Sequence, residues 1–316
     1  MGLSILKVLI TGGAGFIGSH LACRFNNADV YDNLIPYYST KLKLFNKKLI
    51  IENGNRFFEK DIAHLDPKNF DYEYIFHLAA QPGVRYSVLH PYEVVQINLN
   101  ATVKLLETIR KSNTDIKRFV FVSSSSVFGT IEYLPIDEKH PKNPISPYGA
   151  SKLGAEKMVK NYYLHYGIPI VIVRPFTVVG VRQRPDMALH KFIESMIEGT
   201  TINVYGDGTQ TRDWTHVDNI VNGILQASKI KSAIGEDFNL GTNNKISVNE
   251  ILKMIHRYVN NDYKIKYLAK NIADPDNTQA DTSKAKKILG YEPTKTLEDA
   301  IKEHLKFYIN HKYLYK

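Results

Sequence analysis

The sequence of 316 residues contains one cysteine, Cys23, so no disulfide can form within the chain. A chain without disulfides suits a reducing compartment, and we expect a cytoplasmic protein. No run of eighteen apolar residues is present, which argues against a transmembrane helix. Met1 leads directly into a strand-like run, so we expect no signal peptide. No cluster of histidines or carboxylates argues for a metal site, and we expect none.

Acidic residues are fewer than basic ones, 32 against 41, which gives a formal net charge of +9. The basic residues are scattered, with modest clusters at 41–48 and 284–287, and no nucleic-acid-binding motif accompanies them. A positive potential attracts small anionic ligands as well as nucleic acids. We therefore expect a small anionic partner, and neither nucleic acid nor a membrane.

A glycine-rich turn follows the apolar run at 5–10 and precedes a helical pattern at 17–25. Its glycines, Gly12, Gly15 and Gly18, are spaced G-x-x-G-x-x-G. Glycines at such a turn allow close backbone approach and aim a helix N-terminus at a pyrophosphate. The strand, turn and helix in this order predict a dinucleotide-binding site. The predicted contacts in this turn are Gly12, Gly15, Phe16, Ile17 and Gly18.

An acidic residue, Asp32, ends the second strand-like run, 28–31, twenty positions past Gly12. A carboxylate at this place accepts hydrogen bonds from the adenosine ribose hydroxyls. It would repel a 2′-phosphate, and the next residue is Asn33 rather than arginine. NAD is therefore favoured over NADP.

Strand-like and helical segments alternate through the first half of the chain, which predicts an α/β fold with a doubly wound, Rossmann-like parallel sheet. Further strands are expected at 56–60, 74–78, 119–122 and 168–173, and helices at 91–111 and 147–166. Ligands of such sheets bind at the carboxyl ends of the strands. The ends of the third and fourth strands therefore supply further expected cofactor contacts, namely Asp61, Ile62, Leu78, Ala79 and Ala80.

Beyond Arg174 the pattern changes to loops and short helices, with turn signals at 206–208 and 241–244. We expect a cofactor-binding domain at 1–173, rejoined by part of 213–240, and a smaller substrate-binding lobe formed mainly by 174–316. The cleft between them is the expected active site.

Tyr148 and Lys152 are spaced i, i+4 on the helix predicted at 147–166. Side chains at this spacing are neighbours, about 5–6 Å apart at Cβ. A neighbouring cation favours the phenolate, so we expect the pKa of Tyr148 to fall from about 10 towards neutrality. Such a tyrosine can take a proton from a hydroxyl group and later return it. The spacing alone also fits a solvated helix face.

With the glycine turn, the serine run 123–126 before Val127-Phe128-Gly129, and Tyr148-x-x-x-Lys152, the whole chain resembles the extended short-chain dehydrogenase/reductase family. Within that family it is similar to the nucleotide-sugar 4-epimerases. The resemblance implies a catalytic triad of Ser124, Tyr148 and Lys152. It also implies tightly bound NAD and a homodimer formed through the helices 91–111 and 147–166. It assigns Asn33, Asn98 and Pro175 to the cofactor site as well, although an aromatic residue is usual at the last position.

In the mechanism implied by the resemblance, Tyr148 removes the proton of the sugar 4-hydroxyl while NAD⁺ accepts hydride from C4. Ser124 hydrogen-bonds the same oxygen, and Lys152 lowers the pKa of the tyrosine and holds the nicotinamide ribose. The 4-keto sugar then turns over, and the hydride returns to its other face. Related dehydratases carry an Asp-Glu pair where Ser125 and Ser126 stand, and decarboxylases carry a glutamate, so an epimerase is favoured. Another nucleotide-sugar oxidoreductase and a non-catalytic NAD-sensing protein are the alternatives.

Three segments, 36–43, 79–87 and 182–188, resemble the UDP-glucuronate 4-epimerases. Arg184 and Arg85 are the candidates for clamping a sugar carboxylate through two parallel hydrogen bonds; alternatively they meet the diphosphate or structural carboxylates. Thr278 aligns with the residue that limits the pocket in UDP-galactose epimerases. Its small side chain leaves UDP-N-acetylglucosamine and UDP-glucose open.

The resemblance also implies which residues hold the UDP group. Val204 and Tyr205 are expected beside uracil, and Arg212 on the diphosphate. A second diphosphate arginine is replaced here by Lys270 and Asn271. The complete set of expected substrate contacts is Arg85, Ser124, Ser125, Ser126, Thr177, Arg184, Val204, Tyr205, Arg212 and Thr278.

Overall fold

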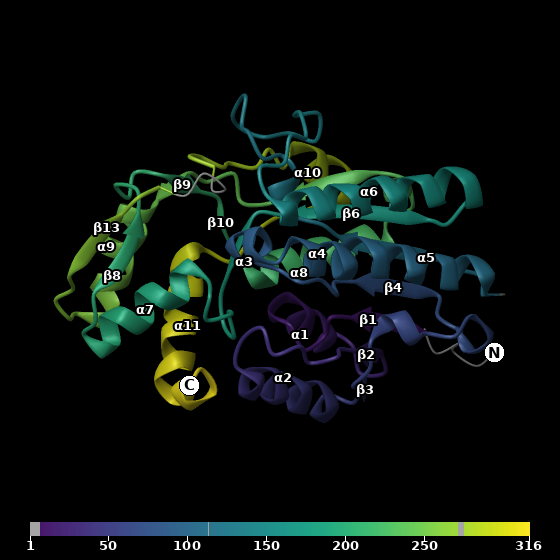
Figure 1. Cartoon of the computed structure of the whole chain (residues 1–316), viewed down its shortest axis with the longest axis horizontal. Coiled ribbons are helices and arrows are strands. Elements are labelled where there is room, and N and C mark those ends of the chain that lie inside the picture. Colours follow the sequence, from purple (N-terminus) through teal and green to yellow (C-terminus); the bar gives the residue numbers. More distant parts are fainter. Residues whose placement is uncertain (1–6, 113, 271–274) are drawn as a thin grey trace.

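The structure is a computed structural model that describes residues 7–112, 114–270 and 275–316. Within these residues a central sheet of seven parallel strands has the order β11-β6-β5-β4-β1-β2-β3, as expected for a doubly wound α/β fold (Figure 1). Its strands are β1 (Val8–Thr11), β2 (Asp29–Tyr31), β3 (Arg56–Phe58), β4 (Tyr74–His77), β5 (Arg118–Val122), β6 (Ile170–Pro175) and β11 (Asp237–Leu240). The first strand begins at Val8, and residue 5, where the apolar run begins, lies outside the described residues.

Helices cover both faces of this sheet, because its central strands are apolar on both sides. In β5, Phe119 and Phe121 pack into one core with α5 and α6, whereas Val120 and Val122 pack into another with α1 and α8. Two-sided burial of this kind is typical of parallel sheets. The helices around the sheet are α1 (Phe16–Ala22), α2 (Thr40–Glu52), α3 (Val84–Leu89), α4 (Pro91–Val95), α5 (Ala101–Lys111), α6 (Pro147–Tyr166), α8 (Val217–Lys229) and α10 (Ser283–Leu289).

The helix α6 has the bounds predicted from the sequence. Ser146 is its N-cap and accepts a hydrogen bond from the Gly149 N–H, and Pro147 occupies the first position. Gly167, with φ of 69°, ends the helix in the left-handed conformation. These signals fix the start of α6, and with it the place of Tyr148.

The helix predicted at 91–111 consists of α4, a π-helical turn at Gln96–Asn100 and α5. Asn98 lies in the π-turn and is buried. Its amide donates to the carbonyl of Gln81 and to Ser151 Oγ, and its Oδ1 accepts from the Gln81 N–H. The turn therefore fastens this helix both to the loop after β4 and to α6.

A smaller lobe lies beyond the carboxyl ends of the strands (left in Figure 1). Its core includes Trp214 and the apolar faces of α7 (Ala188–Glu198), α9 (Val248–Val259) and α11 (Leu297–His311). The remaining strands form two-stranded pairs, namely β7 (Thr177–Val179) with β10 (Trp214–His216), β8 (Ile202–Tyr205) with β13 (Ile265–Leu268), and β9 (Thr211–Arg212) with β12 (Ile246–Ser247). Segments of the chain's second half, β11 and α8, return to the main sheet. The division into domains at residue 173 stays a prediction.

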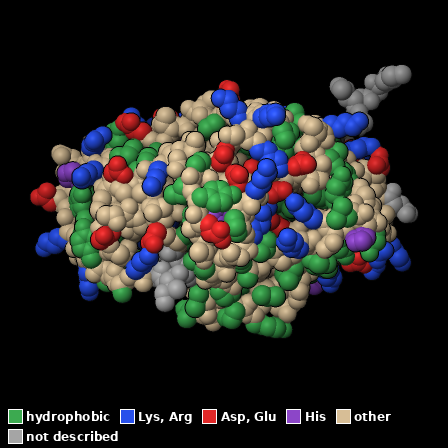
Figure 2. Space-filling view, turned by 90° about the horizontal axis from the view of Figure 1, so that it is seen from above, with side chains coloured by type: hydrophobic (Ala, Val, Ile, Leu, Met, Phe, Trp, Pro, Cys, Tyr) green, Lys and Arg blue, Asp and Glu red, His purple; other side chains and the backbone are tan. Residues whose placement is uncertain are grey.

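The surface shows no single basic face in the view of Figure 2, where lysine and arginine side chains alternate with acidic and apolar ones. Across the described part of the chain, no helix combines the length and apolar character needed to cross a membrane.

Candidate active site

A cleft of about 1500 Å³ lies between the carboxyl ends of the strands and the smaller lobe. Pockets for one small ligand measure about 300–1,000 Å³, so this cleft has room for more than one molecule. All but two of the residues predicted to bind cofactor or substrate line it. From the cofactor set these are Gly12, Gly15, Phe16, Ile17, Gly18, Asp32, Asn33, Asp61, Ile62, Leu78, Ala79, Ala80, Tyr148, Lys152 and Pro175. From the substrate set they are Arg85, Ser124, Ser125, Ser126, Thr177, Arg184, Val204, Tyr205 and Arg212.

The glycine turn fits a dinucleotide because side chains are excluded from it. Gly12 has φ of 72°, and a Cβ there would lie 2.6 Å from the backbone nitrogen of Ala79. A Cβ on Gly18 would overlap with the carbonyl oxygen of Gly12. Gly15 caps α1 without any side-chain hydrogen bond to its first N–H groups. The turn thus packs directly on the end of β4 and presents backbone to the cleft, as binding of a pyrophosphate requires.

Asp32 lies at the end of β2 with both carboxylate oxygens held by backbone. Oδ2 accepts from the Ala14 N–H at 3.0 Å, and Oδ1 accepts from the Leu34 N–H at 2.8 Å. Asn33 donates to Asp61 Oδ2 at 2.9 Å, which joins the ends of β2 and β3. These fixed acceptors fit the ribose and adenine end of NAD.

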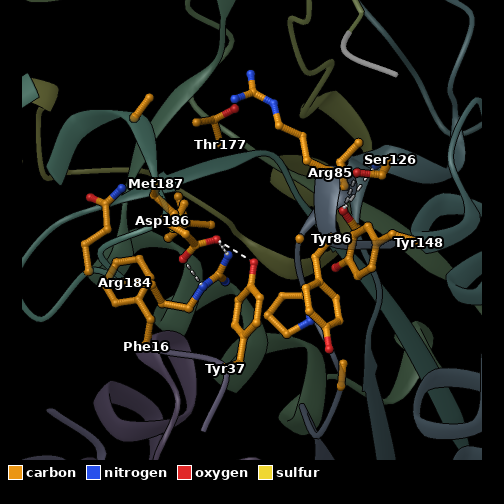
Figure 3. Close-up of a pocket in the computed structure, with 18 of the residues that line it drawn as sticks. Phe16, Tyr37, Arg85, Tyr86, Ser126, Tyr148, Thr177, Arg184, Asp186 and Met187 are labelled. Carbon is orange, nitrogen blue, oxygen red and sulfur yellow. Dashed lines mark hydrogen bonds and ion pairs between the residues drawn. The ribbon is translucent and has the colours of Figure 1, made fainter. Parts of the chain in front are cut away.

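The serine run and the start of α6 also line the cleft, where they meet. A Cβ on Gly149 would overlap with the carbonyl of Ser126, so glycine allows the helix to approach this loop closely. Across this contact Ser124 lies near enough to Tyr148 to lower the pKa of the tyrosine. Ser124 Oγ also lies 3.2 Å from Ser126 Oγ. The structure therefore brings the predicted base, Tyr148, and the serine run together, and Figure 3 shows Tyr148 beside Ser126.

The expected fall in the pKa of Tyr148 is wrong in direction, and Lys152 is not among the groups that shift this pKa. Burial raises the pKa of Tyr148, and the interaction with Ser124 and the charge of Arg184 oppose that increase only in part. Burial also lowers the pKa of Lys152, to about 7. Lys152 Nζ donates to the carbonyl of Val122 at 2.8 Å and lies 4.3 Å from the centre of the Phe121 ring. The helical spacing predicted correctly that Tyr148 and Lys152 lie on one helix, but it contained no information on the desolvation of their side chains.

Arg184 forms a bidentate ion pair with Asp186. Its Nε and Nη2 each lie 2.9 Å from a carboxylate oxygen, and the Tyr37 hydroxyl donates to the same carboxylate at 3.1 Å (Figure 3). Tyr37 and Asp186 line the cleft, but no sequence pattern placed them among the expected site residues. Both stand in the segments that carry the resemblance to glucuronate epimerases, which was the available signal.

A cation–π contact joins two elements that line the cleft. The Arg85 guanidinium, on α3, lies 3.6 Å from the centre of the Tyr205 ring, on β8. Arg212 Nη1 donates to the carbonyls of Thr211 and Asp276, and Lys270 forms an ion pair with Asp276. Asn271, the other substitute for a diphosphate arginine, lies outside the described residues.

Two predicted residues are not part of the lining. Asn98 is buried, and its hydrogen bonds join the π-turn to Gln81 and Ser151. It therefore supports the lining of the cleft without being part of it. Thr278 is buried, and its N–H donates to the Thr211 carbonyl. Its neighbours Asp276 and Asn277 line the cleft instead. Within the described part of the chain, no group of three or more metal-binding side chains comes together.

Known proteins that are similar to this chain include UDP-sugar epimerases. The family model described as GDP-mannose 4,6 dehydratase matches residues 9–304. An uncharacterised UDP-glucose epimerase of Bacillus subtilis is 37% identical, with 96% of this chain and 98% of that protein covered. A UDP-glucuronate 4-epimerase of Thermodesulfobacterium geofontis is 35% identical, with 93% of each chain covered.

Among solved structures, the UDP-glucuronic acid 4-epimerase of Bacillus cereus, in complex with UDP-glucuronic acid and NAD, superposes with a TM-score of 0.91. It is 35% identical, and the match covers 96% of this chain and 99% of that one. The chain therefore belongs to the family of the GDP-mannose 4,6-dehydratase model, within the extended short-chain dehydrogenases/reductases.

Proposed function

We propose that this protein is an NAD-dependent UDP-sugar 4-epimerase that interconverts UDP-glucuronate and UDP-galacturonate. One observation carries the proposal: Ser124, Tyr148, Lys152 and Arg184 line a single cleft, in which Ser124 and Arg184 each lower the pKa of the buried tyrosine. The same cleft contains the glycine turn and Asp32, which fit NAD. The B. cereus enzyme, similar over nearly the whole chain, binds UDP-glucuronic acid and NAD.

In the proposed mechanism, Tyr148 takes the proton of the sugar 4-hydroxyl and later returns it to the same oxygen. Ser124 hydrogen-bonds that oxygen and stabilises the charge that develops on it. Lys152, whose Nζ donates to the Val122 carbonyl, would hold the nicotinamide ribose. NAD, when bound, supplies a hydride acceptor for C4 and a hydride donor to the other face of the 4-keto sugar. A full turnover involves no net oxidation or reduction, so no external oxidant or reductant is needed.

The substrate assignment depends on a carboxylate at sugar C5. An arginine fork is the side chain best suited to a carboxylate, and Arg184 lies within electrostatic reach of the group that acts at C4. Ser125 and Ser126, next to Ser124 in the chain, supply neutral hydroxyls at the positions where a dehydratase or decarboxylase would need an acid or base. UDP-glucose and UDP-N-acetylglucosamine are the second choice, because proteins named as a UDP-glucose epimerase and a UDP-N-acetylglucosamine 4-epimerase are 37% and 28% identical to this chain.

We also propose a cytoplasmic homodimer that takes part in polysaccharide biosynthesis. The dimer is supported by large apolar side chains on neighbouring helices. Leu89 on α3, Tyr92 on α4 and Leu164 on α6 are 76%, 77% and 73% exposed. Exposed apolar surface on these helices, two of which belong to the expected interface, supports the dimer.

The test is to incubate the purified protein, without added cofactor, with UDP-glucuronate, UDP-glucose or UDP-N-acetylglucosamine and to separate the products. We expect UDP-glucuronate to give a product of unchanged mass that co-elutes with UDP-galacturonate. Loss of water or carbon dioxide would identify a dehydratase or decarboxylase instead. Turnover of the neutral sugars alone would remove the carboxylate role of Arg184, and turnover of none would reject the epimerase.

A further inference from the structure

The ion pair between Arg184 and Asp186 is anchored from the opposite wall of the cleft. Both residues belong to the connection between β7 and α7, whereas Tyr37 comes from the connection between β2 and α2. The Tyr37 ring also packs edge-on against Tyr86, with 5.0 Å between ring centres. The carboxylate of Asp186 is thus held by two side chains from different walls (Figure 3).

The backbone of this connection is itself restrained. The Gln183 N–H donates to the Gly180 carbonyl, the Met187 N–H donates to the Arg184 carbonyl, and Gln183 Oε1 accepts from the Gly180 N–H. Arg182 has φ of 61°, a left-handed conformation that is unfavourable for a residue with a Cβ. Strain of this kind persists only where the surroundings impose it, often at functional sites. With the main chain fixed, the Asp186 ion pair determines where the long Arg184 side chain points.

The ion pair with Asp186 occupies one edge of the Arg184 guanidinium and leaves the other edge available for a ligand. Asp186 engages Nε and Nη2, so the edge formed by Nη1 and Nη2 can still receive a second carboxylate in the same plane. A sugar C5 carboxylate is carried by the ring carbon next to C4, where Tyr148 acts. Arg184 and Tyr148 line the same cleft, and the Arg184 charge lowers the pKa of Tyr148, so both groups can serve one sugar bound there.

We propose that Asp186 and Tyr37 are positioning residues that hold the Arg184 fork towards the C5 carboxylate, and that they set the preference for a UDP-hexuronate over a neutral UDP-hexose. This inference rests on the proposed function, since it assumes that the sugar is bound at Tyr148. The ordered fork loses little side-chain freedom when the substrate binds, which favours the charged sugar. A neutral hydroxymethyl group gains nothing from the same arrangement.

The test compares Asp186→Asn and Tyr37→Phe with the unmodified protein, each with its bound NAD content and thermal midpoint recorded. We expect KM for UDP-glucuronate to rise about tenfold in Asp186→Asn, which corresponds to about 1.4 kcal/mol. A smaller rise is expected in Tyr37→Phe, because it keeps the ion pair. In both variants kcat should stay within about threefold, as for an interaction made equally in the ground and transition states. Calorimetric binding of UDP-glucose should change by less than about twofold.

Tyr133→Phe is the matched control, because Tyr133 donates the same kind of hydrogen bond to Asp137 but does not line the cleft. Its KM and kcat for UDP-glucuronate and its affinity for UDP-glucose should equal those of the unmodified protein. A lower KM for UDP-glucuronate in Asp186→Asn would overturn the proposal, since Asp186 would then be a competitor for Arg184. Equal losses for both sugars would overturn it too, since the role would be structural. If the unmodified protein binds UDP-glucuronate no better than UDP-glucose yet epimerises the latter, this inference fails and the epimerase stands.

Discussion

At the scale of single residues, burial rather than helical spacing determines the pKa values of Tyr148 and Lys152. The spacing of Tyr148 and Lys152 predicted their position on one helix, and α6 confirms it. It did not predict that burial would raise the pKa of Tyr148 and lower that of Lys152. Residue types and intervals report which side chains are neighbours, whereas desolvation depends on the chain segments that pack over them, here β5 and the serine run.

The role of Tyr148 is tested by Tyr148→Phe. Removal of the hydroxyl leaves the ring and takes away the group that interacts with Ser124. We expect epimerisation to fall at least about a thousandfold, in line with loss of an acid–base group together with its hydrogen bond. The bound NAD, measured after denaturation by absorbance and chromatography, should be unchanged. Substantial remaining activity would show that another group is the base.

At the scale of elements, the turn between β1 and α1 is sensitive to a single methyl group. In Gly18→Ala the new Cβ would overlap with the Gly12 carbonyl, so the turn must shift away from the cleft. We expect loss of bound NAD and a destabilisation of about 1–3 kcal/mol, as for overpacking elsewhere. Nucleotide content and calorimetric unfolding measure the two effects.

Gly154→Ala provides the control for that prediction, because Gly154 also lies inside a helix, where a Cβ would meet only Leu99 at 3.4 Å. Alanine is favoured over glycine in a helix by about 0.5–1 kcal/mol, so this variant should be at least as stable as the unmodified protein. It should also keep its NAD. Loss of NAD from both variants would mean that the glycine turn has no special part in binding.

The sequence predicted most elements of the sheet but not how the second half of the chain joins it. Apolar runs and glycine or proline signals are local, and they identified β1 to β6 and the bounds of α6. The edge strand β11 was not predicted as a strand, because its four residues include Asp237 and Asn239. Its place is determined by pairing with β6 and by the ion pair between Asp237 and Arg174, both distant in sequence.

At the scale of the whole molecule, the site is formed from both halves of the chain. Tyr37 reaches Asp186 and Arg85 reaches Tyr205, so each contact joins the sheet side of the cleft to the other wall. Arg85 and Arg184 were predicted through the resemblance of their segments to known ones. Tyr37 and Asp186 were not, because their contact spans 149 positions of sequence. Contacts of this length depend on the folded arrangement of the two walls.

The proposed homodimer is also a prediction about the whole molecule. Leu164, on α6, is 73% exposed and lies on the helix that packs beside α4 and α5. In Leu164→Glu a carboxylate would be buried without a partner at the interface. We expect the dimer to weaken by about a hundredfold or more, because an unpaired buried charge costs about 3–5 kcal/mol. Sedimentation should therefore show a shift from dimer to monomer.

Ile309→Glu is the control for the dimer, since Ile309 is 58% exposed but lies on α11, in the smaller lobe. This change adds the same charge to an apolar surface position outside the proposed interface, so the dimer should persist. Dissociation in both variants would indicate a general effect of charge, and a monomeric unmodified protein would reject the dimer. Because residues of one chain line the cleft, the Leu164→Glu monomer should also retain NAD and epimerise UDP-glucuronate.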